Sequence, residues 1–314
     1  MNAAARERGR LFERPAQPRE LHIRQRHLAI LANLARLRLA IAPQLAALDG
    51  GSEQTVSREL LALWEHEYVE RLLGQLDSRF LYRGSLPIAY GLSRKGARLL
   101  RKHGHHVGRR ILDGIDKERE AGWRFIEHRV EISDFIVRLE LAARARSDVG
   151  ILQRSDIVEA SPKTTRTRRV RLSARVRTDH GLRVLSVDPD EVFGLRFFET
   201  EEESYFMFER DRGEMPVERH SRKDQTYFAK KMMIYAEANK AGDHRKEFGI
   251  PHFRVATVTT TADRASQMIE AQIEMTGGRG SNMFLFIDDA TLRTGNPLEA
   301  LWTTGKRERI RLVD

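Results

Sequence analysis

Two short segments in the C-terminal half carry carboxylates at a spacing that could hold a metal ion. In residues 204–216, SYFMFERDRGEMP, Glu209 and Asp211 end an apolar run, and Asp190 follows Pro189 in the earlier segment VLSVDPDEVFGL. Alternate residues of a strand project from one face, about 6.8 Å apart, so Glu209 and Asp211 should face one site while Arg210 points away. Converging carboxylates repel one another unless a hard cation neutralises them. The pattern predicts a Mg²⁺ or Mn²⁺ site made by Asp190, Glu209 and Asp211.

A lysine on the next expected helix, residues 225–241, completes the candidate catalytic set. Phe228, Lys231, Tyr235 and Ala238 recur at helical spacing, so Lys231 lies on the packed or site-facing stripe. There its ammonium could stabilise charge that develops during a reaction. Acids two apart on a strand are more often ion-paired structural residues. The alternative is therefore that arginines neutralise the three acids and that no metal binds.

The elements expected around these residues form an α/β domain. Apolar patterns predict a helix over 123–146, strands over 151–158, 163–177, 184–195 and within 204–216, and then strand 253–258, helix 264–274 and strand 282–287. In 163–177, Val170, Leu172, Ala174 and Val176 alternate with arginines, which is typical of a strand with one apolar and one basic face. This order resembles the PD-(D/E)xK nuclease core with its central mixed sheet. Pro189–Asp190 corresponds to PD, and Glu209–Arg210–Asp211 corresponds to (D/E)xK.

The sequence departs from the motif of that nuclease core at one position. Asp211 stands where the lysine of the motif belongs. Lys231 on the following helix is the candidate for a migrated lysine, a variation that is known in the superfamily. The missing lysine favours an inactive, nuclease-like fold, whereas the three acids with Lys231 favour a metal-dependent endonuclease or nickase.

The N-terminal half has the pattern of a winged helix-turn-helix. A helix is expected over 24–38, Pro43 opens a second, and Ser52 caps a third whose inner face carries Val56, Leu60 and Leu63. Residues 68–72, 80–82 and 90–92 are expected to form the wing, and Ser93 caps a basic helix. The candidate DNA contacts lie on the third helix, the wing, the basic helix and the basic strand: Gln54, Thr55, Arg58, Arg83, Arg94, Lys95, Arg98, Arg169 and Arg171.

Charge supports a nucleic-acid partner. The chain has 314 residues, 55 Lys and Arg, 45 Asp and Glu, and no cysteine, so it has neither disulfides nor a thiolate metal site. Residues 21–110 contain fifteen basic and seven acidic residues, which is +8 of the net +10. A basic surface binds DNA phosphates with release of counterions. No run of about 18 apolar residues and no signal-peptide core is present, so we expect a cytoplasmic protein without a membrane partner.

Taken as a whole, residues 24–290 resemble the bacterial replication-relaxation family of plasmids and integrative elements. The matching stretches are Arg24–Gln25–Arg26, YGLSRKG at 90–96, the helical His128, Asp190 with VFGL at 192–195, ERDRG at 209–213 with Met215–Pro216, and Lys231 with Tyr235. The resemblance implies a winged-helix DNA-binding module fused to a nuclease-like domain. It implies a role in replication, relaxation or mobilisation of a mobile element.

These observations define an expected architecture. Residues 1–20 form a basic arm, 21–110 the winged helix-turn-helix, 111–148 a connecting helix and 149–314 the nuclease-like domain. The expected partner is double-stranded DNA, together with other relaxosome or replication proteins and a second copy of the chain as a homodimer. The alternative function is that of a transcription regulator or relaxosome accessory factor whose nuclease-like domain is catalytically inactive.

Overall fold

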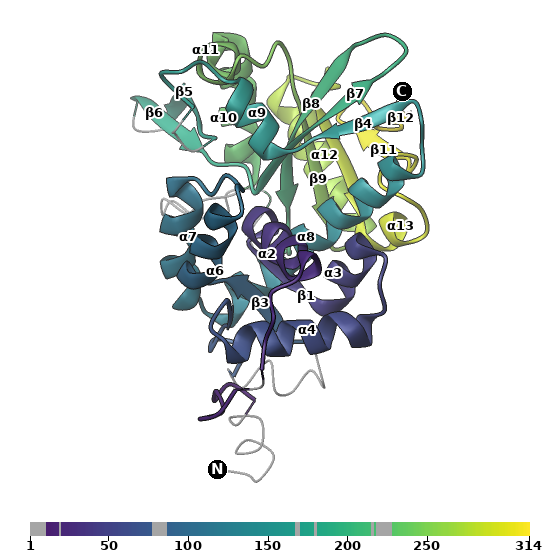
Figure 1. Ribbon diagram of the computed structural model, residues 1–314. Helices are drawn as coiled ribbons and strands as arrows, with labels where there is room; N and C mark the ends of the chain where they lie inside the picture. The colour runs from purple at the N-terminus through teal and green to yellow at the C-terminus, as the bar shows by residue number, and fades with distance from the viewer. Residues whose placement is uncertain are drawn as a thin grey trace. The chain divides into compact units, whose positions relative to one another are not determined.

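The computed structural model describes residues 11–18, 20–76, 87–166, 170–178, 181–214, 217 and 228–314. It divides into two compact units, unit 1 (Met1–Val137) and unit 2 (Arg138–Asp314), and the boundary falls inside a helix. The chain is mixed α/β, as expected from its sequence (Figure 1). None of the helices in the described part is both long and apolar enough to cross a bilayer.

Unit 1 combines helices with a small antiparallel sheet in the order β1-β3-β2. Its described elements are α2 (Gln25–Leu37), β1 (Leu39–Ile41), α3 (Ala42–Asp49), α4 (Glu53–Glu65), β2 (Val69–Arg71), β3 (Ala89–Leu92), α6 (Arg94–Lys102), α7 (Arg109–Arg119) and the first part of α8 (Trp123–Arg144). The four helices expected from capping and periodicity up to residue 102 are confirmed. The expected wing strand at 80–82 lies outside the described residues.

Serine caps explain two of the helix starts in unit 1. The Oγ atom of Ser52 accepts a hydrogen bond from the backbone N–H of Thr55, and Ser93 does the same for Gly96. Each bond satisfies one of the N–H groups that a helix leaves without a partner in its first turn. The inner face of α4 is then buried through Val56, Leu60 and Leu63, which are all 0% exposed.

The segment expected to be one connecting helix is instead two helices, α7 and α8, with α8 packed into unit 1. Ile126 of α8 is fully buried in a cluster with Leu39, Leu72 and Ala89. Ser133 donates a hydrogen bond to the carbonyl oxygen of Leu39 at 2.6 Å. Glu120, Ala121 and Gly122 separate the two helices. The first half of α8 therefore belongs to the core of the N-terminal unit.

Unit 2 is built on a seven-stranded mixed sheet in the order β12-β11-β10-β9-β8-β7-β4. Its elements are β4 (Val149–Leu152), α9 (Arg154–Ala160), β5 (Leu172–Thr178), β6 (Gly181–Val187), β7 (Glu191–Phe197), β8 (Glu203–Arg210), α10 (Phe228–Ala241), α11 (Asp243–Phe248), β9 (Arg254–Thr259), α12 (Ala262–Met275), β10 (Phe284–Asp288), α13 (Asp289–Arg293), β11 (Trp302–Thr304) and β12 (Arg309–Ile310). Strands β8, β9 and β10 run parallel at the centre, and the outer pairs are antiparallel.

The prediction of a strand over 151–158 was wrong for most of its length. Strand β4 ends at Leu152, and α9 begins two residues later. The side chain of Asp156 accepts a hydrogen bond from the backbone N–H of Gln153, which closes the first turn of the helix. Residues 154–160 therefore form a helix although the β-branched residues Ile157 and Val158 favour strands. The predicted strand over 184–195 is likewise two strands, β6 and β7, separated by Asp188–Asp190.

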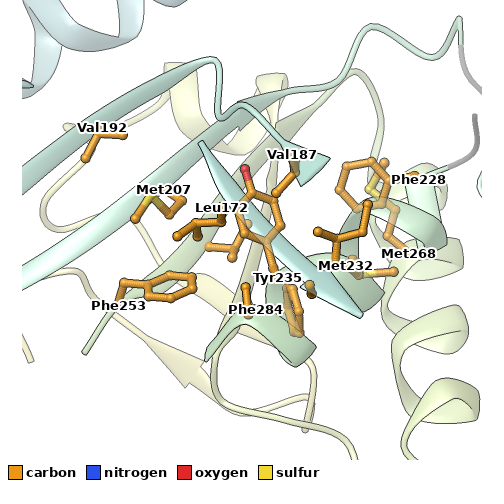
Figure 2. Close-up of a cluster of buried hydrophobic side chains, with 14 of the residues drawn as sticks. Leu172, Val187, Val192, Met207, Phe228, Met232, Tyr235, Phe253, Met268 and Phe284 are labelled. Atoms are coloured by element: carbon orange, nitrogen blue, oxygen red, sulfur yellow. The ribbon is translucent and has the colours of Figure 1, made fainter. Parts of the chain in front are cut away.

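The core of unit 2 lies between the sheet, helices α10 and α12, and a separate two-stranded hairpin of β5 and β6. Figure 2 shows Leu172 and Val187 of the hairpin beside Met232 and Tyr235 of α10. Strand β5 has the predicted alternation, because Leu172, Ala174 and Val176 are buried while Arg171 and Arg175 are exposed. The hairpin therefore covers α10 with its apolar face.

Candidate functional site

Glu209 lies near the end of the central strand β8 and is almost completely buried, with 1% of its surface exposed. Its two carboxylate oxygens have different partners. Oε2 accepts a bond from the Lys231 ammonium at 2.8 Å, and Oε1 accepts one from the Tyr235 hydroxyl at 2.6 Å. Burial raises the pKa of Glu209, and Lys231 counteracts part of that increase. The strand and α10 thus build a buried acid–lysine–tyrosine cluster.

The two α10 residues of the cluster are one turn apart, so they lie on the same face of the helix. Burial alone would lower the pKa of Lys231, but the negative charges of Glu209 and Asp190 raise it above its usual value. Burial and Glu209 both raise the pKa of Tyr235 well above its usual value, so the tyrosine is a neutral hydrogen-bond donor. Lys231 is therefore the counter-charge of Glu209, on the stripe of α10 where the sequence placed it.

Asp190 is held next to this cluster by the turn between β6 and β7. Its Oδ2 atom accepts a hydrogen bond from the backbone N–H of Arg210 at 2.9 Å. Asp190 also contributes to the electrostatic environment of Glu209, Lys231 and Tyr235. The structure therefore brings Asp190, Glu209 and Lys231 together.

Asp211, one residue beyond β8, has a different set of partners. Arg264 at the start of α12 binds both of its oxygens, with 2.8 Å between Nη2 and Oδ1. Thr259 donates a further bond to Oδ2 at 2.7 Å. Only 5% of the Asp211 side chain and 14% of the Arg264 side chain are exposed. Asp211 is thus neutralised by a buried arginine.

Arg210, which lies between the two acids in the sequence, forms an ion pair with a residue of another helix. Its guanidinium binds Asp289 at the start of α13 through two bonds of 2.9 and 2.8 Å. Glu209 and Asp211 meet side chains of α10 and α12 instead, as expected from the alternation of strand residues.

The fit of a divalent cation can be judged from these bonds. Both oxygens of Glu209 and both oxygens of Asp211 already accept bonds from neighbouring side chains, three of them from cations. Within the described ranges, no three His, Asp or Glu side chains converge as a metal site would require. A divalent cation at Glu209 and Asp211 would have to displace Lys231 and Arg264 from these carboxylates.

The candidate DNA contacts of α4 lie on the side opposite its buried face. Gln54 and Arg58 are exposed, and Thr55 is half-buried. The guanidinium of Arg58 lies 3.4 Å from the Thr55 hydroxyl, and no carboxylate binds it among the described residues. Fixed caps and a buried inner face hold these polar side chains on one exposed surface.

The remaining predicted contacts differ in their surroundings. Arg94 of α6 forms two bonds with Asp116 of α7, and the Lys95 ammonium lies 3.9 Å from Glu67 and 4.9 Å from the centre of the Tyr68 ring. Arg98 is exposed. Arg171 binds Asp188 through bonds of 2.6 and 2.8 Å. Arg83 and Arg169 lie outside the described residues.

Sequence reasoning missed the partners of Asp211. Arg264 and Thr259 lie 53 and 48 positions away along the chain, on elements joined to β8 only through the fold. One signal was available: a charged group at the end of a central strand requires a counter-charge nearby, and Arg264 is the first arginine after strand β9.

Comparisons with known proteins gave one positive result. No curated protein and no solved structure matches the chain. The family model described as replication-relaxation matches residues 31–244, more than half of the chain, and spans α4, the acidic strand β8 and the lysine-bearing helix α10. The chain therefore belongs to the replication-relaxation family.

Proposed function

We propose that this protein is a DNA-binding accessory factor of a plasmid or integrative mobile element that acts in replication, relaxation or mobilisation. Unit 1 is then a winged helix-turn-helix domain, with α4 as the recognition helix and the β2–β3 region as the wing. The observation that carries the proposal is the exposed face of α4, where Gln54, Thr55 and Arg58 lie opposite a fully buried side.

The physical basis is the chemistry of the DNA grooves. An α-helix fits the major groove, where an arginine fork can donate two bonds to guanine and a glutamine amide can pair with adenine. The element order α2-β1-α3-α4-β2-β3 agrees with a winged helix-turn-helix. Exposed Arg98 on α6 is suited to a phosphate contact, which positions a protein without reading sequence.

The test first identifies the DNA sequence that the protein prefers and then measures the affinity for it. Wild-type protein selects a preferred duplex from a random library, and fluorescence anisotropy then measures Kd for that duplex and for a scrambled one. Arg58→Ala should weaken preferred binding by about 1–3 kcal/mol and reduce discrimination, whereas Arg98→Ala should weaken both duplexes alike. Ser57→Ala, at an exposed position of α4, is the control. Equal affinity of Arg58→Ala and wild type for the preferred duplex would contradict the assignment of α4.

The arrangement of acids in unit 2 favours a binding or scaffolding role for the nuclease-like domain. A metal-dependent endonuclease needs open carboxylates, and here Lys231 and Arg264 occupy the carboxylates of Glu209 and Asp211. Buried acids neutralised by internal cations are typical of a structural ion-pair network.

Metal-dependent cleavage is the second candidate function, supported by one observation. Lys231 meets Glu209 at 2.8 Å from the helix where a migrated lysine is expected. Supercoiled plasmid incubated with Mg²⁺ or Mn²⁺ tests this candidate, with Glu209→Gln and Lys231→Met alongside wild type. Nicking by wild type that both variants lose would establish an enzyme. A lack of cleavage, with no metal-induced change in wild-type melting temperature, would leave the accessory role.

A further inference from the structure

The β5–β6 hairpin has one face in the core and one face in contact with solvent. Inward-facing Leu172 and Val187 are buried against α10 and its neighbours (Figure 2), and Ala174 on the same face is also buried. The register pairs Ser173 with Ser186 and Arg175 with Val184 on the outer face. Strand residues directly opposite each other share a face, so these pairs form one continuous outer surface.

The outer face carries aliphatic side chains that a protein surface seldom exposes so fully. Leu182 and Val184 are 66% and 68% exposed, the highest values among the large apolar residues that the structure describes. Nearer the base of the hairpin, the hydroxyls of Ser173 and Ser186 are 2.8 Å apart, and Arg171 and Asp188 form an ion pair. The apolar part of the face therefore lies toward the free end of the hairpin.

An exposed arginine lies on the outer face beside these aliphatic residues. Arg175, directly across from Val184, and Arg183, at the free end on the opposite face, are exposed and have no carboxylate partner among the described residues. Arg171 and Arg196, exposed arginines of the same unit, bind Asp188 and Glu203 instead. Residues 163–187 contain eight basic residues and one acidic residue. Such a segment attracts a polyanion.

We propose that the outer face of this hairpin, at the described residues of β5 and β6, is a second contact surface for double-stranded DNA. The inference rests on the proposed DNA-binding function and extends it to unit 2. Arg175 binds a phosphate, and Val184 and Leu182, on the same face, contact the edges of the bases. DNA is favoured over a protein partner because the segment carries a large excess of positive charge.

The shape of the hairpin agrees with this occupant. A two-stranded antiparallel ribbon is one of the two secondary structures that the major groove admits, and apolar side chains there can contact the thymine methyl group. The two strands lie about 4.8 Å apart, well within a groove about 12 Å wide. Because the other face of the hairpin is anchored on α10, the ribbon keeps its shape without DNA.

The test compares full-length variants by anisotropy titrations on one duplex at several salt concentrations. Arg175→Ala should lower the slope of log K against log salt by about 0.9, the value for one phosphate contact, and should raise Kd on the order of threefold at moderate salt. Arg175→Lys should retain the slope, because lysine keeps the charge. Val184→Ser should raise Kd at an unchanged slope. The matched control, Arg196→Ala, removes an exposed but ion-paired arginine and should bind like wild type.

The outcomes distinguish this inference from the function on which it rests. If wild type binds DNA and Arg58→Ala weakens binding while the hairpin variants match wild type, the hairpin inference is overturned and the function of α4 stands. If wild type binds no DNA, both are overturned. If the hairpin variants change only the sedimentation coefficient, the face is a protein interface and the inference fails. Circular dichroism melting confirms that each variant is folded.

Discussion

The carboxyl group of Glu209 lies where water cannot solvate its ionised form, so its protonation and the stability of the fold are linked. The pKa of a buried carboxyl rises because the ionised form loses solvation, and Lys231 offsets only part of that loss. A group whose folded pKa lies above its unfolded value stabilises the fold below the unfolded pKa. That contribution is lost as pH rises through the folded pKa.

Replacing Glu209 with Gln removes this titration. The free energy of unfolding of wild type minus that of Glu209→Gln should decrease as pH rises from about 4 toward 8. The decrease should be about 1.4 kcal/mol for each unit by which the pKa of Glu209 in the folded protein exceeds its pKa in the unfolded chain. Urea unfolding of both proteins across this range measures the difference. A difference that grows with pH would mean that Lys231 lowers the pKa of Glu209 and that the ionised form is the stabilised one.

The buried pair of Asp211 and Arg264 should be sensitive to loss of one partner. Arg264→Met leaves the Asp211 carboxylate, 5% exposed, without its cation and should destabilise unit 2 by about 3–5 kcal/mol. Asp211→Asn in the same protein should restore part of that loss. Arg307→Met, which breaks an exposed pair with Glu270, should stay within about 1 kcal/mol of wild type. Comparable losses for Arg264→Met and Arg307→Met in chemical denaturation would contradict the argument.

At the scale of elements, helix α4 depends on the cap that starts it. Ser52→Ala removes the acceptor for the backbone N–H of Thr55 and should cost about 1 kcal/mol of stability, whereas Ser52→Asp should retain it. The first turn of α4 also carries Gln54 and Thr55, so Ser52→Ala should weaken DNA binding as well. Thermal melts and anisotropy check both effects, and Ser57→Ala is the control. An unchanged melting temperature for Ser52→Ala would show that tertiary packing alone holds this end.

Sequence patterns located most elements because caps and periodicity act over a few residues. Ser52 and Ser93 mark helix starts, and the stripe of α10 places Lys231 correctly toward β8. Short β1 lacks such a signal, since its three residues gain partners only through β3. The same limit applies to the site. The periodicity of α10 alone predicts the position of Lys231, whereas Arg264 contacts Asp211 only after β9 has paired with β8.

At the scale of the whole chain, unit 1 needs residues well beyond the expected boundary at 110. Gln44 donates a bond to the carbonyl oxygen of Val130 at 2.9 Å, and Arg129 and Ser133 donate to that of Leu37. A fragment of residues 21–110 lacks these donors and the buried Ile126.

A fragment of residues 11–144 should therefore fold with a cooperative thermal transition, whereas residues 21–110 should melt at a much lower temperature or without cooperativity. Circular dichroism on the two purified fragments measures the difference. Equal melting temperatures would show that α8 adds nothing to the stability of unit 1, contrary to its buried contacts.

Because α8 supplies part of the core of unit 1, that core can be completed only after α8 has been synthesised. A ribosome that has just made β3 and α6 must add about 35 more residues before the chain reaches Val137, which takes roughly 2–7 s at 5–20 residues per second. During that interval the apolar surface of Leu39, Leu72 and Ala89 has no cover from Ile126. The nascent N-terminal unit is then at its most prone to aggregation, and the interval ends when α8 docks.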